Sequence, residues 1–346
     1  MTTHIITPEG EVTIILREPN APFAPLPPES VKVPALAASN TPTTIITLPS
    51  STTEQHSTGK DSSDTDVHFC VSAAHLIHAS PVFKKVLSGG WKESVTFKET
   101  GTVEIEAHGW DTNAFTILMH ILHCQPQKLP KQGDLELAAK VTVLADYYDC
   151  ADTVRYYIDP WIPRPLDTLL EDGRRGALIG LWVAWALRRP TSFTKCSSLL
   201  MSSATRCITA LGLPLPQKII EKLNQGRDNA LRDTMYAIFE KRLDLTLNDR
   251  CTVTCRSMTC RSIMLGALLI HLRNNNINLL RLGPHNDISL KGLVTSVKSI
   301  RIAQWREYVN SDGPFTWHKC AQSDFTKIFN GLTYQVAGLE LKDFKW

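Results

Sequence analysis

Strand patterns are confined to the first third of this 346-residue chain, whereas helical periodicity runs through all of it. Short β-branched or alternating runs occur at 12–16 (VTIIL), 67–71 (VHFCV) and 102–107 (TVEIEA), and beyond Pro160 such runs almost vanish. A chain of this length also favours two domains. The sequence therefore predicts a mixed α/β domain over residues 1–160 and an all-helical domain over residues 161–346.

Three amphipathic helices are expected in the first domain. Ser80-Pro81 places a capping residue before a proline at the first helical position, and Gly89-Gly90 ends that helix. A second helix is expected over Asp111–His123. A third follows Asp134 as its cap. The apolar positions of this third helix are Leu137, Val141, Leu144 and Tyr148.

The segment 18–66 lies between the first two expected strands and is rich in Pro, Ser, Thr and Ala. Such a composition buries too little apolar surface to offset the entropy lost on ordering. We therefore expect residues 18–66 to form a mobile inserted loop, much longer than an ordinary hairpin connection.

The second domain is expected to consist of helices over Ala177–Leu187, Gln217–Asn224, Asp228–Leu243 and Ser262–Leu272. The first of these is apolar all round but too short to span a bilayer, so it is predicted to be a buried core helix. The start of the chain lacks a basic and apolar signal sequence. These features predict a protein of the cytoplasm or nucleus with no membrane partner.

Nine cysteines in a chain of this kind are expected to be reduced thiols, and some have the spacing of metal ligands. Cys255 and Cys260 are separated by four residues, and His318 and Cys320 by one. The sequence predicts a closed structural zinc site formed by these four side chains. Cys251 is an alternative to Cys255, and reduced thiols without metal are the alternative to zinc.

Motifs that catalysis requires are absent from the sequence. It contains no G-x-S-x-G elbow, P-loop, G-x-G-x-x-G turn or H-E-x-x-H helix, and its eleven histidines are interpreted as structural. Cys150 has no base near it in sequence. The net charge of +3, without a basic stripe or a zinc finger, argues against nucleic acid as a partner. We expect the protein not to be an enzyme.

The segment 69–87, FCVSAAHLIHASPVFKKVL, carries an aromatic-x-Val, then His and Leu, then Ser-Pro-x-Phe at the start of a helix. The positions concerned are Phe69, Val71, His75, Leu76, Ser80, Pro81 and Phe83. This pattern resembles the signature of BTB/POZ domains. GGWKES at 89–94 and LAAKVTVLADYYDC at 137–150 are similar to fungal members of that family. The resemblance implies a small mixed sheet flanked by helices.

Members of the BTB/POZ family homodimerise or bind partners such as cullin-type ubiquitin ligase scaffolds and transcriptional co-repressors. The resemblance therefore implies a non-enzymatic protein-interaction module that acts as an adaptor or scaffold. Its alternatives are a cullin substrate adaptor and a regulator that acts through a co-repressor. A homodimer is left open, because the 18–66 insertion falls where many family dimers form their seam. The expected interaction residues, or else core residues, are Leu76, Val82, Phe83, Val86 and Leu87.

Overall fold

The computed structural model describes residues 2–26, 66–162, 173–247, 257–279, 287–302, 304–308, 315–318 and 324–344. The chain divides into two compact units, Met1–Lys131 with Leu144–Tyr157 and Gln132–Val143 with Ile158–Trp346. Our expected boundary at residue 160 lies beside Ile158, but the structure also assigns Gln132–Val143 to the second unit. Most of the predicted loop over 18–66, from residue 27 to 65, lies outside the described residues.

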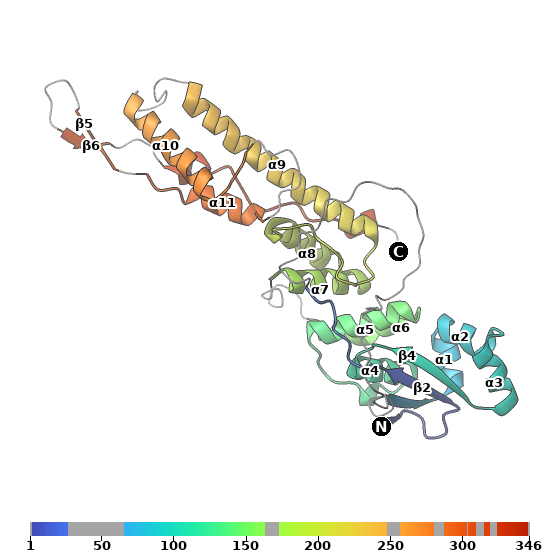
Figure 1. Cartoon of the computed structure of the whole chain (residues 1–346). Coiled ribbons are helices and arrows are strands. Elements are labelled where there is room, and N and C mark those ends of the chain that lie inside the picture. The colour runs from blue at the N-terminus through green and yellow to red at the C-terminus, as the bar shows by residue number, and fades with distance from the viewer. Residues whose placement is uncertain are drawn as a thin grey trace, which may run out of the picture. The chain divides into compact units, whose positions relative to one another are not determined.

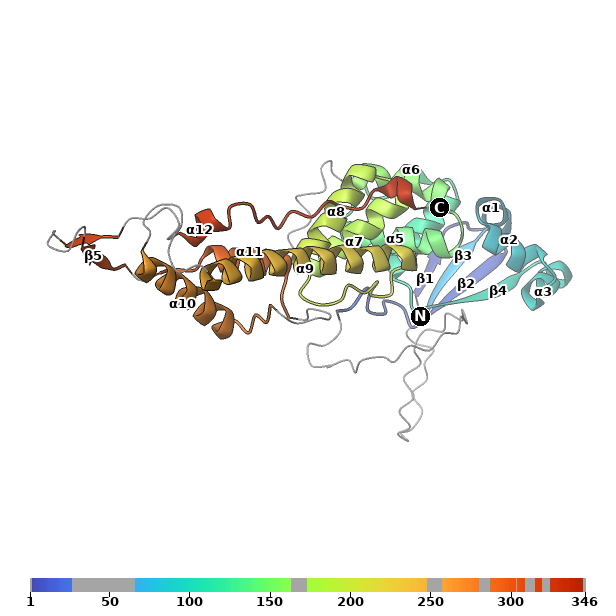
Figure 2. The same ribbon diagram turned by 90° about the horizontal axis from the view of Figure 1, so that it is seen from above.

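The first unit contains a four-stranded mixed sheet (Figures 1 and 2). Its strands, in the spatial order β1-β3-β2-β4, are β1 (Thr2–Ile5), β3 (Val67–Val71), β2 (Val12–Arg17) and β4 (Val103–His108). The central pair β2–β3 is antiparallel, whereas β1 runs parallel to β3 and β4 parallel to β2. The three predicted strands are confirmed. The edge strand β1 was not predicted, because its four largely exposed residues carry no apolar pattern.

The central strand β2 is buried on both faces, which explains its continuous apolar sequence. Ile14 and Leu16 are fully buried, and Ile15 on the opposite face is 6% exposed. The turn before the strand passes very close to β3, because a Cβ at Gly10 would lie 2.7 Å from the backbone nitrogen of Val71. Glycine is therefore required at the entry to the strand.

The helices over the first 161 residues are α1 (Ala73–Ala79), α2 (Pro81–Ser88), α3 (Lys92–Thr100), α4 (Thr112–Leu122), η2 (Pro126–Lys128), α5 (Leu135–Tyr147), α6 (Ala151–Ile158) and η3 (Asp159–Trp161). Both views show α1, α2 and α3 at one end of the sheet (Figures 1 and 2). The predicted caps are confirmed: Ser80 Oγ accepts from the Phe83 N–H at 3.2 Å, and Asp134 Oδ1 accepts from the Leu137 N–H at 2.7 Å.

The second unit is mostly helical. Its further elements are α7 (Gly173–Ala186), α8 (Pro190–Ser203), α9 (Gln217–Leu247), α10 (Met258–Asn274), α11 (Leu290–Lys298), β5 (Arg306–Tyr308), β6 (Phe315–Trp317), α12 (Phe325–Ile328) and η5 (Leu341–Asp343). The expectation of an all-helical domain is wrong in one respect, since β5 and β6 form an antiparallel pair. Strands of three residues are too short to show an alternating pattern in the sequence.

The two helices expected over Gln217–Asn224 and Asp228–Leu243 are one helix of 31 residues, α9. Gly226, which lies in the predicted gap, does not interrupt it. A Cβ at Gly226 would lie 2.4 Å from Met201 Sδ in α8. A side chain at position 226 would force Met201 to move, so the glycine favours close packing between α8 and α9 and does not mark a helix end.

The core of the second unit includes α7, which confirms the buried helix predicted over Ala177–Leu187. Every α7 residue from Gly176 to Trp185 is buried, and the Trp182 indole donates to Thr142 Oγ1 at 3.0 Å. None of the helices in the described ranges is both long and apolar enough to cross a membrane.

Candidate functional site

The five predicted interaction residues occupy two different environments in the first unit. Leu76 in α1 and Phe83 and Leu87 in α2 are at most 2% exposed, so they are core residues. The Phe83 ring stacks on Tyr148, with ring centroids 4.5 Å apart. Val82 and Val86 are half-buried and lie one turn apart on α2. Of the five side chains, only these two valines reach the surface of the described unit.

Two exposed apolar side chains that sequence reasoning missed lie on the next helix. Trp91, the N-cap residue of α3, is 63% exposed, and Val95 one turn later is 45% exposed. Ser94 fixes this turn, because its Oγ accepts from the Gly90 N–H and donates to the Trp91 carbonyl. The sequence feature that could have indicated these exposed side chains is the tryptophan that follows Gly89-Gly90 at the start of a polar helix.

Helices α2 and α3 pack against each other, so their exposed and half-buried apolar residues belong to neighbouring elements of the unit. We call Val82, Val86, Trp91 and Val95 the α2–α3 surface. Four exposed lysines occur on the same two helices, at positions 84, 85, 92 and 98. None of the four forms an ion pair with another described residue. Because α3 also carries Glu93 and Glu99, the two helices have four lysines and two glutamates. The region therefore combines apolar side chains with a net positive charge, which suits a partner with an acidic rim.

His123 and His75 of the first unit form a stacked pair, with ring centroids 5.0 Å apart. The buried His123 Nε2 accepts from the Ser72 N–H at 2.9 Å. Its Nδ1 must then carry the proton and donate to the Met119 carbonyl at 2.8 Å. This ring is neutral. Its Nε2 bond to Ser72 joins the end of α4 to the start of α1, and its Nδ1 bond to Met119 lies within α4. Burial lowers the pKa of His123 below its usual value, and the neighbouring His75 and His120 lower it further.

Acid is expected to destabilise the first unit through His123, because protonating Nε2 breaks its bond to Ser72. An unfolded histidine gains a proton below about pH 6.5, whereas folded His123 stays neutral to lower pH. The contribution of neutral His123 to the free energy of unfolding is therefore fully present above about pH 6.5 and decreases at lower pH. One pH unit lower, the loss is at most about 1.4 kcal/mol. Urea unfolding of wild type and His123→Gln at pH 8 and pH 5.5 measures this. The variant should lose less stability between the two pH values, and equal losses would contradict the assignment.

Cys150 lies at the start of α6 and is buried. Burial, with a smaller contribution from the Asp149 charge, raises the pKa of the Cys150 thiol to about 12. The thiol is therefore protonated at neutral pH and does not supply the thiolate that nucleophilic attack needs.

The four predicted zinc ligands are only partly within the described residues. Cys260 is buried in the first turn of α10, and His318 follows β6 with its ring stacked on Trp305 at 4.3 Å. Cys255 and Cys320, and the alternative ligand Cys251, lie outside the described ranges. Within those ranges no three His, Cys, Asp or Glu side chains gather as a metal site. The zinc site stays a prediction.

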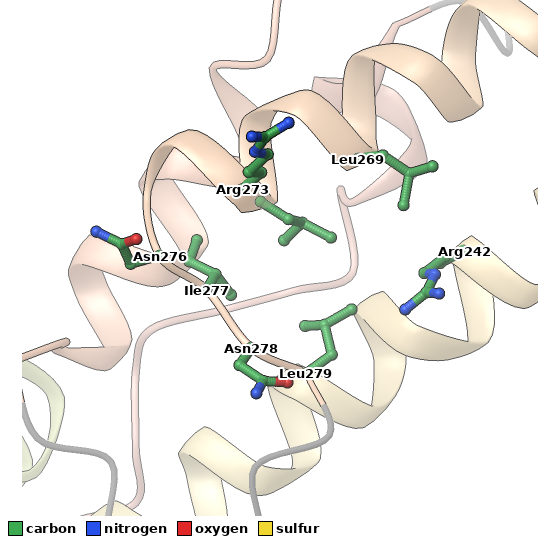
Figure 3. A pocket seen from close by; sticks show the side chains of 8 residues that line it. Arg242, Leu269, Arg273, Asn276, Ile277, Asn278 and Leu279 are labelled. Carbon is green, nitrogen blue, oxygen red and sulfur yellow. The ribbon is translucent and has the colours of Figure 1, made fainter.

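A pocket of about 420 Å³ lies in the second unit, between α9, α10 and the segment that follows α10 (Figure 3). It is lined by Arg242, Leu269, Leu272, Arg273, Asn276, Ile277, Asn278 and Leu279. No motif in the sequence indicated it, since the pocket forms only when residues near position 242 meet those near position 275.

No protein-family model matches the chain, and no curated protein matches it. The small mixed sheet and the surrounding helices are compatible with the α/β architecture that the BTB/POZ resemblance implies. Membership of that family remains a proposal.

Proposed function

We propose that the protein is a non-enzymatic interaction module of BTB/POZ type that binds a protein partner through the α2–α3 surface. The observation that carries this proposal is the exposure of Trp91, 63%, one turn from the exposed Val95. A folded chain gains little from leaving an indole in water, whereas tryptophan is enriched among the residues that dominate protein–protein binding.

The chemistry of the surface suggests how such a partner binds. Trp91 is the expected anchor, and Val82, Val86 and Val95 supply apolar area around it. Lysines at positions 84, 85 and 92 would attract an acidic rim on the partner. Such charges raise the association rate more than they raise the affinity. Binding should therefore weaken with salt, mainly through slower association.

The proposal covers more than one partner. A homodimer is tested by light scattering, which separates the 38.6 kDa monomer from twice that mass. A cullin adaptor is tested by pull-down with a recombinant cullin N-terminal domain, and a co-repressor partner in the same way. A cytoplasmic or nuclear location belongs to the same proposal. It is supported by the absence of any disulfide between two of the six described cysteines.

Changing Trp91→Ala together with Val95→Lys should reduce partner binding at least tenfold, because the double variant removes the anchor and charges the apolar surface. Both side chains are exposed, so stability should change little. Quantitative affinity capture with the full chain as bait measures the effect. Tyr156→Ala is the matched control, because this 80% exposed aromatic lies on α6 of the same unit. Equal recovery of the same partner by wild type and double variant would contradict the proposal.

A further inference from the structure

We propose that the pocket between α9 and α10 is a second binding site, which takes a peptide segment that carries a carboxylate beside an aliphatic side chain. The site lies in the second unit and does not depend on the α2–α3 surface. Three features lead to this occupant: an apolar floor, a guanidinium without a partner among the described residues, and apolar surface that continues beyond the pocket.

The floor of the pocket is apolar. Leu272 and Ile277 belong to the buried core of the second unit, and Leu269 beside them is 39% exposed. Figure 3 shows Leu269 and Arg242 facing each other across the gap between α10 and α9, with Leu279 coming from the segment after α10. An aliphatic side chain inserted here would contact leucine and isoleucine below and an arginine at the side.

The charge at the pocket is positive and uncompensated within the described residues. The lining contains two arginines and two asparagines but no carboxylate. The acidic residues nearest to Arg242 along α9 are Glu240 and Asp244, each two positions away. Asp244 is engaged, because its oxygens contact Lys241 Nζ at 2.8 Å and Arg261 Nη2 at 3.3 Å, and Glu240 is hydrogen-bonded to the Tyr236 side chain. No described side chain forms an ion pair with Arg242. A guanidinium beside an apolar floor is suited to bind a ligand in which a carboxylate lies next to an aliphatic group.

The occupant should be larger than the pocket. Phe239, one turn before Arg242 on α9, and Leu265, one turn before the lining residue Leu269 on α10, are half-buried apolar residues. Residues three or four apart share a face of a helix. This apolar surface lies outside the 420 Å³ volume, where a small ligand does not reach. A peptide with further apolar residues covers both the pocket and its margins.

The test uses fluorescence anisotropy of the full-length protein with a short fluorescein-labelled peptide of leucine and glutamate. Two matched peptides replace glutamate by glutamine or by lysine. Octanoate, a free aliphatic carboxylate, is added as competitor. The leucine–glutamate peptide should bind at least tenfold more tightly than either matched peptide, and octanoate should not displace it at concentrations comparable to the peptide.

Arg242→Glu should weaken binding of this peptide at least tenfold, and Arg242→Lys should weaken it less because the charge is kept. Arg232→Glu is the control, since Arg232 is exposed on the same helix outside the pocket. Thermal unfolding of each variant verifies that the second unit is folded. The proposal is overturned if the wild-type chain does not bind the peptide, if the glutamine peptide binds equally, or if Arg232→Glu weakens binding as much as Arg242→Glu. If octanoate displaces the peptide with an affinity similar to that of the peptide, the occupant of the pocket is a free aliphatic carboxylate. That result would also overturn the proposal.

Discussion

Replacing Arg227 with methionine is expected to lower the free energy of unfolding by about 1–3 kcal/mol. Arg227 is 1% exposed in the middle of α9. Its Nε donates to the Ala204 carbonyl and its Nη2 to the Thr205 carbonyl, both at 3.0 Å, and its Nη1 contacts Asp228 at 2.7 Å. Methionine keeps the length of the side chain but leaves the carbonyl of the buried Ala204 without its donor, which is the costly part of the change. The exposed Thr205 and the partly exposed Asp228 side chain can bond to water instead.

The measurement for Arg227→Met is urea unfolding followed by helical circular dichroism. Arg232→Met is the matched control, because Arg232 lies on the same helix but is exposed. The control should change stability by less than about 0.5 kcal/mol. Equal effects of the two substitutions would show that the buried guanidinium does not hold α9 to the segment after α8.

Phe83→Ala is expected to destabilise the first unit by about 3–5 kcal/mol, because it removes a buried aromatic ring and leaves a cavity. Phe83 is 1% exposed and stacks on Tyr148 with an interplanar angle of 9°. Val82→Ala, one residue earlier on α2, removes a half-buried side chain and should cost less than about 1.5 kcal/mol.

The same pair of variants separates a core role for Phe83 from a role in partner binding. If Phe83 contributes to the core, as its burial indicates, urea unfolding detects the loss in Phe83→Ala directly. A Phe83→Ala protein that keeps wild-type stability but loses its partner would contradict this assignment. It would place Phe83 back in the interaction surface.

Local sequence signals predicted most of the first unit. The strands at 12–16, 67–71 and 102–107 carry β-branched or alternating residues, and Ser80 marks the start of α2 through its capping hydrogen bond. In the second unit, Asp134 marks the start of α5 in the same way. These signals act over a few residues, so they are visible without the rest of the fold.

The features that the sequence did not predict depend on distant residues. Strand β1 forms through pairing with β3, whose partner residues lie more than sixty positions later in the chain. The gap expected between Asn224 and Asp228 is helical, and Gly226 within it lies close to Met201 of another helix, which no local pattern shows. Helical periodicity likewise identified an apolar stripe on α2 but could not show that Tyr148 covers Phe83 while Val82 and Val86 reach the surface.

The most direct test of the central claim is photo-crosslinking from position 91 in cells that make the full-length protein. A benzophenone amino acid replaces Trp91 in one protein and Tyr156 in another, and both positions are exposed aromatics of the first unit. If α2–α3 is the partner-binding surface, position 91 should give a discrete crosslinked protein that position 156 does not give. Adding Val95→Lys should abolish the crosslink. No crosslink from position 91, or the same products from both positions, would contradict the account.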